Sequence, residues 1–513
     1  MSAAHAQSGY SGTVPSTIQT PAEASGYLAY TPPDTAFTWL TELSALAGPV
    51  MRVDPFLTLP DGATGPPAVI PVASLGIGAA TGGAGSHGNR VRVLVIGSQH
   101  GDERTGYEVA LRLARDLSVG ELRPLLDDIE VTIVPVMNPV GMRDGTRFNG
   151  SGFDPNRDHV ALASPANRAL WELHATIEPH VVLDLHEMGP TPYEAQVGLP
   201  THPNVDPRLT EFARFWLLPY VVRALSANDV RFHEYVAENP DPAYQTGGGD
   251  PEEIFYSLAP ITANNARNAF SLAGSLALLL ETASSHEIDD LSRRTDRLYL
   301  TAVSFLEVIA GMSEEVLERT WQRPNDGEIA SPPLALQAEN AADPEHPSLH
   351  WLRWSERGAA VPYTVDEWRP AVEVRTSLPL PAAWLILPDE TELVAHLLRH
   401  GIRVERLLEP VRLPVSAYRT PDSLEPAANR TLPAGSWLVR SDQARQRLLF
   451  TLIEPGSADG WFRSPLPALG SGDTAPEEAA REFPVYRFDG TVPALPAVAV
   501  SSDELVEPSP VGR

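Results

Sequence analysis

The sequence predicts an α/β fold: a mostly parallel, mixed sheet flanked by helices, followed by a small α+β module. Three observations lead to this prediction. Short apolar and β-branched runs alternate with helical patterns over residues 27–315. Polar loops follow several of the expected strands, as in open α/β sheets. A stretch rich in Pro, Ala and acidic residues at 316–347 then separates a second unit from the first.

Composition limits the possible classes of protein. The chain has 513 residues, 43% of them apolar, which is enough for a large core and at least one more domain. It has no cysteine, which excludes disulfides and thiolate chemistry, and its 38 basic residues are all arginine, which excludes a lysine Schiff base and a P-loop. The net charge of −28 argues against nucleic acid or an anionic membrane surface as partner. We also expect no membrane span, since no apolar run is long enough.

Residues 1–26 are predicted to form an N-terminal tail. Within it, Ala4-His5-Ala6 is typical of the small-x-small end of a secretory signal, although no apolar segment precedes it. We therefore expect a secreted or periplasmic protein, with a cytoplasmic location as the alternative.

The first elements follow this tail. Asp34 is expected to cap a helix that ends at Gly48 and carries Phe37, Leu40, Leu43 and Leu46 on one face. A strand is expected at 68–77. The glycine-rich loop at 79–88 contains a formal G-x-G-x-x-G, but a strand follows it where the nucleotide-binding motif needs a helix. Nucleotide binding is therefore not expected.

The central strand is predicted to begin at Val91. It leads into a polar loop with His100 and Glu103, and then into a helix whose apolar face recurs at helical spacing. The next strand, 130–136, leads to an expected turn at Asn138-Pro139-Val140-Gly141. The elements expected after it are a helix from the cap Ser164 to Ile177, a strand at 180–185, a strand ending before Glu281, and a helix at 291–309.

The chain is predicted to divide into a tail at 1–26, a catalytic domain at 27–315, a linker at 316–347, a small α+β module at 348–455 and an irregular C-terminal region at 456–513. The module is expected to contain strands at 383–387, 402–407, 411–419 and 436–440, and helices at 390–400 and 442–452.

The ends of the predicted strands carry the groups of a catalytic metal site. His100 and Glu103 follow one strand, His186 ends another, and Glu281 ends a third. A catalytic zinc site uses three protein ligands and keeps one position open for water, whose pKa the ion lowers toward neutrality. Two imidazoles and a carboxylate satisfy this requirement. The apolar run 276–280 predicts that Glu281 is buried, with a raised pKa, and placed to act as a general base.

The polar loop at 143–157 adds groups that bind anions. It offers Arg147, and the pair Asn156-Arg157, as hydrogen-bond donors. One arginine near a zinc ion can stabilise an oxyanion, and another with an amide beside it can hold a terminal carboxylate. Asp154 can orient a ligand histidine.

In this order, the five motifs resemble those of the carboxypeptidase A-like zinc metallocarboxypeptidases. The motifs are His100 to Glu103, Asn138 to Gly141, Arg147 to Arg157, Asp184 to His186, and Glu281. The resemblance covers residues 27–309. It implies a zinc carboxypeptidase-like sheet that binds one zinc ion per chain and hydrolyses C-terminal peptide bonds.

The resemblance also implies a role for each site residue. It implies that His100, Glu103 and His186 bind zinc, that Arg147 stabilises the oxyanion, that Asn156 and Arg157 clamp the substrate carboxylate, that Glu281 is the base, and that Tyr244 is a mobile tyrosine covering the substrate. Arg267 and Asn268 are the alternative to Tyr244 in substrate binding.

Some features leave the substrate open. Pro155 stands before the Asn-Arg pair, where the family often has Leu. Glu187-Met188-Gly189 follows the third ligand, as in some longer bacterial members, which the C-terminal module also resembles. Aspartoacylase-like and succinylglutamate desuccinylase-like deacylases of N-acyl amino acids share the zinc core and are the alternative reading. A catalytically silent peptide-binding module is the third.

Overall fold

The computed structural model describes residues 18–59, 68–76, 89–240, 254–284, 288–321, 333–463 and 483–501. The glycine-rich loop at 79–88 and Tyr244 lie outside these ranges. Within them, no helix combines the length and apolar character needed to cross a bilayer.

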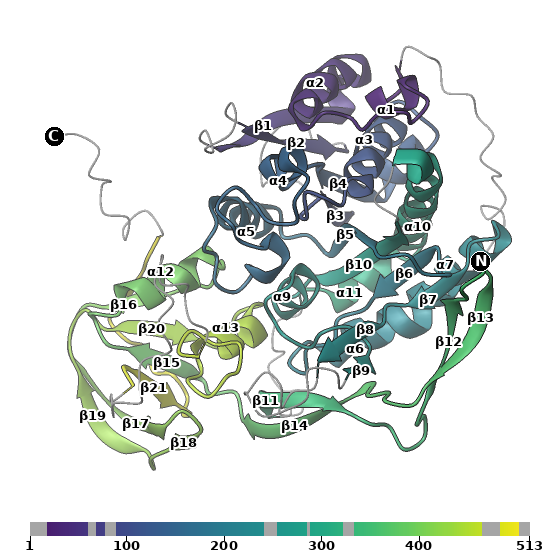
Figure 1. Ribbon diagram of the computed structural model, residues 1–513. Helices are drawn as coiled ribbons and strands as arrows, with labels where there is room; N and C mark the ends of the chain where they lie inside the picture. Colours follow the sequence, from purple (N-terminus) through teal and green to yellow (C-terminus); the bar gives the residue numbers. More distant parts are fainter. Residues whose placement is uncertain are drawn as a thin grey trace.

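An eight-stranded mixed sheet is the centre of the first unit (Figure 1). Its strand order is β1-β2-β4-β3-β5-β10-β6-β7. The strands are β1 (Met51–Leu59), β2 (Ala68–Leu75), β3 (Val91–Gly97), β4 (Ile129–Val134), β5 (Val181–Met188), β6 (Ala195–Gly198), β7 (Phe232–Glu234) and β10 (Leu276–Ala283). The four middle strands, β4, β3, β5 and β10, are parallel. The predicted fold class is confirmed, and the carboxyl ends of these strands share one edge.

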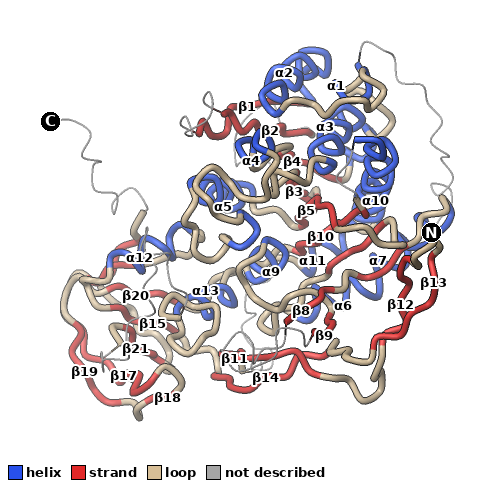
Figure 2. The backbone as a smooth tube through the Cα atoms, viewed as in Figure 1, coloured by secondary structure: helices blue, strands red, loops and turns tan. Residues whose placement is uncertain are grey.

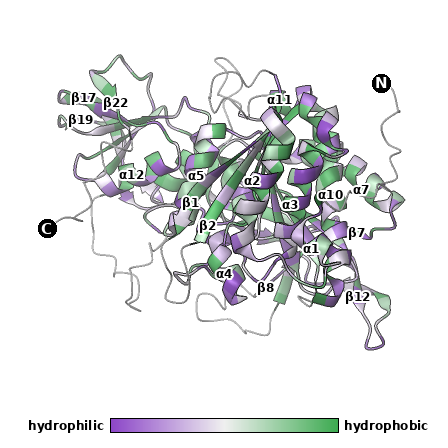
Figure 3. Ribbon diagram, turned by 90° about the horizontal axis from the view of Figure 1, so that it is seen from above, coloured by the Kyte–Doolittle hydropathy of each residue, from purple (hydrophilic) through white to green (hydrophobic). Residues whose placement is uncertain are grey.

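Helices cover both faces of this sheet (Figure 1). On one face α3 (Thr105–Ser118) contacts α2 (Ala36–Ala47) and α10 (Leu291–Gly311), which in turn contacts α7 (Leu218–Ala227). On the other lie α5 (Pro165–Ile177) and α9 (Ala266–Leu272). Seen from above, α2, α3, α5, α7 and α10 mix hydrophobic and hydrophilic residues, as amphipathic helices do (Figure 3).

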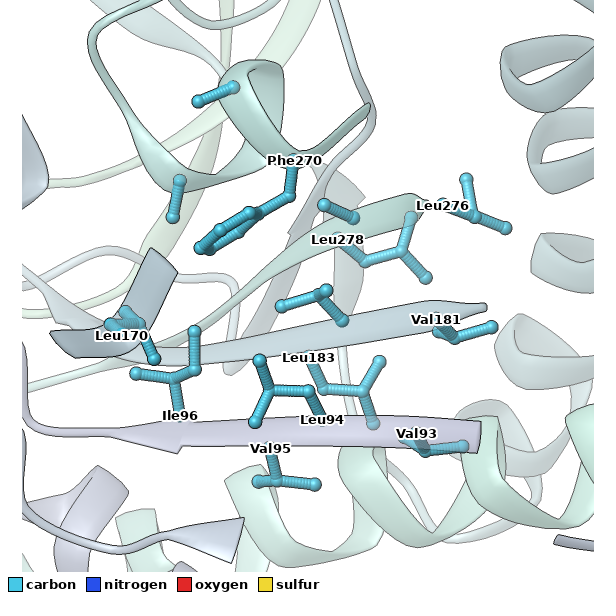
Figure 4. Close-up of a cluster of buried hydrophobic side chains, with 14 of the residues drawn as sticks. Val93, Leu94, Val95, Ile96, Leu170, Val181, Leu183, Phe270, Leu276 and Leu278 are labelled. Atoms are coloured by element: carbon cyan, nitrogen blue, oxygen red, sulfur yellow. The ribbon is translucent and has the colours of Figure 1, made fainter. Parts of the chain in front are cut away.

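Figure 4 shows how the middle strands are buried. Side chains of β3 alternate between the two faces: Leu94 and Ile96 lie on the side of Leu170 and Phe270, and Val95 points to the opposite side. All five side chains are fully buried. Burial on both faces explains why these strands are continuous apolar runs in the sequence.

Two local predictions need correction. Helix α2 begins at Ala36 with Thr35 at its N-cap, not with Asp34, and Leu46 is 66% exposed although it was expected on the buried face. The Asn138–Gly141 segment was expected to be a turn; it opens the short helix α4 (Pro139–Asp144), because the Asn138 side chain caps the N–H of Gly141. The cap at Ser164 is confirmed, since its hydroxyl accepts from Asn167 N–H.

The remaining elements of the first unit are shorter. They are α1 (Pro21–Ala24), α6 (Pro207–Phe212), a π-helical turn (Ala213–Leu217), β8 (Ala237–Pro240), β9 (Ile254–Ser257), α11 (Ser313–Arg319) and 3-10 turns at Pro33–Thr35, Gly48–Val50, Arg123–Asp127, Pro155–Arg157 and Ile288–Asp290. Helix α1 lies in the segment expected to be a tail, where Thr20 and Glu23 form a capping box.

Two strand pairs follow the first unit. The first pair, β11 (Leu334–Ala341) with β14 (Ala371–Leu378), begins inside the segment predicted to be a linker. The second, β12 (Leu349–Trp354) with β13 (Ala360–Val365), forms a hairpin at one side of the molecule (Figure 2). It lies beside β7, where the rings of His233 and Trp351 are in contact (Figure 1). We call residues 349–365 the arm. The Leu352 N–H donates to the Tyr193 hydroxyl at 3.1 Å, which ties the arm to the first unit.

The C-terminal module has its own eight-stranded sheet, of order β18-β17-β21-β15-β20-β16-β22, with β19 also paired to β17. Its elements are β15 (Ala383–Ile386), α12 (Thr391–Arg399), β16 (Glu405–Leu407), β17 (Val411–Thr420), β18 (Ser423–Leu424), β19 (Ala428–Leu432), β20 (Trp437–Arg440), α13 (Gln446–Ile453), β21 (Val485–Phe488) and β22 (Ala497–Ala499). Helix α12 contacts α5 and α13 contacts α9, so the module packs on the first unit. Strand β21 lies in the region expected to be irregular, yet it pairs with β15 and β17.

Candidate metal centre and active site

The first turn after β3 packs closely against the beginning of helix α4. A Cβ atom at Gly101 would lie 2.0 Å from the carbonyl carbon of Gly141, so no side chain fits there. The first turn also contains Ser98, which has a positive φ of 45° and whose hydroxyl donates to the carbonyl of Glu103. This packing holds the segment between His100 and Glu103 in a compact loop at the carboxyl edge of the sheet.

Three donor groups converge at this edge. Nδ1 of His100 lies 2.6 Å from Oε1 of Glu103, and Nδ1 of His186 lies 2.7 Å from Oε2 of the same carboxylate. The two Nδ1 atoms are 3.2 Å apart. All three side chains are buried, and one ligand atom from each falls within 4.8 Å of the others. Two imidazoles and a carboxylate are the nitrogen and oxygen ligands that zinc takes in catalytic sites, so the donor set fits the expected ion.

The charges of this cluster compensate one another. Burial by itself would raise the pKa of Glu103, but the imidazoles of His100 and His186 outweigh it and hold that pKa well below its usual range. Burial likewise opposes protonation of His186, but the carboxylates of Asp184 and Glu103 raise its pKa well above the usual value. The site is therefore built to hold positive charge next to Glu103.

Each histidine has a carboxylate behind it. Oδ1 of Asp154 lies 3.2 Å from Nε2 of His100, and Oδ2 of Asp184 lies 3.0 Å from Nε2 of His186. Gln99 in turn donates to both oxygens of Asp184 at 2.8 Å. Such carboxylates fix the orientation of a ligand imidazole and leave its Nδ1 facing the ion. Asp154 thus lies against the histidine that the sequence predicts it to orient, and Asp184 lies in the same way against His186.

Arg147 lies against the donor cluster. Its Nε donates to Oδ2 of Asp154 at 2.7 Å, and its Nη1 lies 3.1 Å from Nδ1 of His100 and 3.4 Å from Oε1 of Glu103. The side chain is 35% exposed, so one side of the guanidinium faces the open pocket. It is therefore close enough to the donors to interact with a charged oxygen developing beside them.

The two residues expected to bind the substrate carboxylate, Asn156 and Arg157, differ in burial. Asn156 is buried: its Nδ2 lies 3.1 Å from Nε2 of His186, and its Oδ1 accepts from Ala266 N–H at 2.8 Å. Arg157 is exposed, and its Nη1 donates to the carbonyl of Asn156 at 2.8 Å. Both line the pocket described below, with Arg157 at its more accessible side.

Glu281 stands beside His186 because of strand register. In β10 it pairs with His186 of β5, and on the other side with Gln196 of β6, so the three side chains share one face of the sheet. Oε2 of Glu281 is buried and has no hydrogen-bond partner among the described residues. Burial raises the pKa of Glu281 to about 8, against the opposing charge of His186. A divalent cation among the donors would lower that pKa again, because opposite charge favours the carboxylate.

These groups open into a pocket of about 730 Å³. It is lined by the expected residues, among them Arg267, the alternative to Tyr244 in substrate binding. Gln196, Tyr235 and four residues of the arm, Trp351, Leu352, Arg353 and Trp354, line it as well. Tyr235 is close to the site: burial raises its pKa, and the charges of Glu281 and Arg267 both act on it. No motif in the sequence singles out Tyr235 or the arm. Gln196 lies in the short strand β6, where a polar residue between apolar ones is a weak strand signal, and Tyr235 directly follows β7.

Glu187 points away from the reacting centre. Its Oε1 accepts from the backbone N–H of Thr105 at 2.5 Å, and Nε of Arg294 lies 3.1 Å from its Oε2. It therefore anchors the start of helix α3, where a carboxylate is favoured by the helix dipole. Asn268 does not line the pocket; its side chain bonds the carbonyl of Pro260 and the Thr201 backbone.

The fold and donor set can now be compared with known proteins. Residues 71–184 match the sequence model of the zinc carboxypeptidase family. This segment runs from β2 to β5 and includes His100 and Glu103. The match supports the class of hydrolase that the motifs predict, a metallopeptidase of the carboxypeptidase type.

Curated relatives of this chain are named as carboxypeptidases. The chain is 24% identical over 441 residues to Carboxypeptidase 2 of Trichophyton tonsurans, covering 78% of this chain and 77% of the relative. It is 25% identical over 440 residues to Carboxypeptidase 2 of Trichophyton rubrum, with the same coverage. These relatives are fungal, and the expected likeness to long bacterial members with a C-terminal module stays a prediction.

Among solved structures, the metallo-carboxypeptidase from Burkholderia cenocepacia has a TM-score of 0.39 at 19% identity, over 55% of this chain and 68% of that chain. The carboxypeptidase A from Helicoverpa armigera has a TM-score of 0.41 at 13% identity, over 56% of this chain and 75% of that chain.

The carboxylates behind the histidines yield a test of the metal centre. Asp154→Asn should keep the fold but weaken zinc binding by about 10–100-fold, since it removes the charge that orients His100. Competition with a zinc chelator measures this. Asp343→Asn, at a position far from the site in sequence and on the surface, is the control and should bind zinc as the parent does. Equal zinc affinity in the Asp154→Asn protein would show that Asp154 does not support a ligand.

Proposed function

We propose that this protein is a zinc-dependent metallocarboxypeptidase that hydrolyses C-terminal peptide bonds, with Glu281 as general base. The observation that carries the proposal is the shared face of His186 and Glu281. His186, near the end of β5, is one of the three donors, and Glu281, in register with it on β10, has a buried Oε2 without a hydrogen-bond partner among the described residues. The family match over residues 71–184 and the names of the fungal relatives support the same reaction.

A zinc ion bound by His100, Glu103 and His186 would supply Lewis-acid polarisation and a water nucleophile at neutral pH. The chain's own groups must then manage the proton. Glu281 lines the pocket, and its buried Oε2 makes no hydrogen bond among the described residues, so it is available to accept a proton from water. The same atom can then deliver that proton to the amine that leaves when the peptide bond breaks.

Two arginines complete the proposed mechanism. Arg147, held by Asp154, is positioned to donate to the oxygen of the tetrahedral intermediate, whose negative charge a preorganised donor stabilises. Arg157 lies farther out, where it can bind the free carboxylate at the end of a peptide. This places the scissile bond between the donor cluster and Arg157, as removal of a C-terminal residue requires.

A matched pair of glutamates tests the base. Glu281→Gln keeps the side-chain shape and should keep zinc and substrate binding, while kcat falls by about 10²–10⁴-fold because the proton carrier is lost. Glu187→Gln removes a carboxylate of the same sheet edge that bonds Thr105 instead of facing the substrate. The measurement is zinc content together with kcat for both proteins. If Glu281→Gln turned over normally and Glu187→Gln did not, the base would be misassigned.

If Arg157 binds the terminal carboxylate of the substrate, the enzyme should require a free C-terminus. Peptides with an amidated C-terminus should be poor substrates, and Arg157→Ala should raise KM for free peptides by about 10–100-fold, the effect of losing a hydrogen bond to a charged group. Measuring kcat and KM for a matched pair of free and amidated peptides, with the parent protein and with Arg157→Ala, checks both predictions. Equal cleavage of the two by the parent protein would contradict the exopeptidase assignment. N-acyl amino acids belong in the same assay, because a strong preference for them would favour the deacylase alternative.

A further inference from the structure

Unpartnered polar atoms gather on the wall of the pocket next to Glu281. The side chains of Arg267 and Gln196 belong to residues that line the pocket. Nε of Arg267 and both amide atoms of Gln196 are buried and have no hydrogen-bond partner among the described residues. Buried polar groups are nearly always satisfied in folded proteins, because leaving one unpaired costs free energy. Unpaired polar atoms in the wall of a binding pocket therefore point to a group that the substrate brings.

Arg267 is held rigidly in this wall. It lies in the first turn of α9 and is 3% exposed. Its Nη2 donates to the carbonyl of Pro260 at 2.7 Å and to Oγ1 of Thr201 at 3.1 Å. Strand β6 makes room for the guanidinium at Gly198, where a Cβ atom would lie 3.1 Å from Nη1. The neutral acceptors fix the position of the guanidinium but do not neutralise its charge.

Arg267 also lacks a carboxylate partner. Among the described residues none lies within ion-pair distance of it, whereas the equally buried Arg294 pairs with Glu187 and Asp290. Burial lowers the pKa of Arg267 to about 10, which reflects the cost of a desolvated, unpaired cation. Arg445 likewise has no carboxylate partner in the part of the chain that the structure describes, but its guanidinium stacks on the ring of Trp321, and the residue does not line this pocket. Among these buried arginines, Arg267 alone therefore offers its charge to a ligand in the pocket.

The depth of Arg267 decides which substrate group it meets. Arg157 is exposed and can reach a terminal carboxylate at the more accessible side of the pocket, while Arg267 is buried against β6 and β10. The charges of both arginines act on Tyr235, so all three belong to the same region. A C-terminal residue whose main-chain carboxylate is held by Arg157 would direct its side chain inward, toward Arg267 and Gln196.

We propose that Arg267, with Gln196 beside it, selects peptides that end in an acidic residue by binding the side-chain carboxylate of that residue. The proposal rests on the proposed carboxypeptidase function and names its substrate class. The guanidinium pairs with the carboxylate, and the Gln196 amide provides an additional donor. A neutral C-terminal side chain would leave the buried cation unpaired, which is the strongest basis a pocket has for rejecting a substrate.

The test uses N-blocked peptides that differ only in a C-terminal Glu, Gln or Leu. The parent zinc enzyme should have the highest kcat/KM for the Glu peptide, and Arg267→Met should lower that value by at least about 30-fold while changing the Leu peptide far less. The control is Arg157→Gln, which should reduce all three peptides alike. A parent enzyme that cleaves the Leu peptide as well as the Glu peptide overturns the proposal. A uniform loss in Arg267→Met also overturns it, since it would make Arg267 an anchor for the main-chain carboxylate.

A binding measurement keeps this test separate from the proposed function. Glutarate carries two carboxylates at the spacing of a glutamate side chain and terminus, and butyrate carries one. Calorimetry with the parent protein should show that glutarate binds at least about tenfold more tightly than butyrate, and that Arg267→Met removes this difference. If glutarate were favoured but no peptide were cleaved, the acidic subsite would stand and the peptidase function would fail. Equal binding of the two acids by the parent contradicts the subsite even if Arg267→Met fails to fold.

Discussion

The site depends on one carboxylate that contacts two imidazoles. Glu103 places one oxygen beside His100 and the other beside His186, although the first comes from a turn after β3 and the second from β5. The contact is possible because β3 and β5 are parallel neighbours, so their carboxyl ends meet at one edge. Glu281 joins them because β10 pairs in register with β5 on its other side. Strand order thus creates the site, and each residue needs only to stand at the end of its strand.

Charge compensation makes this arrangement stable in a buried place. Asp154 and Asp184 lie behind the two histidines, and Arg147 balances Asp154. Removing one partner of such a buried network typically costs about 3–5 kcal/mol, because it leaves a desolvated charge. The pocket wall differs from this network: Arg267 and Gln196 keep unpaired polar atoms. The contrast separates groups that hold the site together from groups that are left available to the substrate.

Much of the fold and of the metal centre could be predicted from the sequence, because their signals are local. The β-branched run before His100 and the apolar run before Glu281 predict strands, and the structure has strands there. The structure after Asn138 is ambiguous from the sequence, since an asparagine before proline fits both an isolated turn and the N-cap of a helix. Strand β21 could not be predicted, because its partners β15 and β17 lie far away in sequence and only the pairing makes it a strand.

The pocket wall could not be predicted for the same reason, because Gln196 faces Glu281 only through the antiparallel pairing of β6 with β10. The arm reaches the pocket from beyond the predicted linker, and no local pattern reports such a contact.

The central claim is that His100, Glu103 and His186 hold a single zinc ion at the carboxyl edge of the sheet. The most direct measurement is a crystal structure of the zinc-loaded protein with diffraction data on both sides of the zinc absorption edge. The account predicts one strong anomalous peak, in contact with Nδ1 of both histidines and with the carboxylate of Glu103. A zinc-loaded crystal with no anomalous peak among these three side chains, or with its zinc bound elsewhere on the chain, would contradict the account.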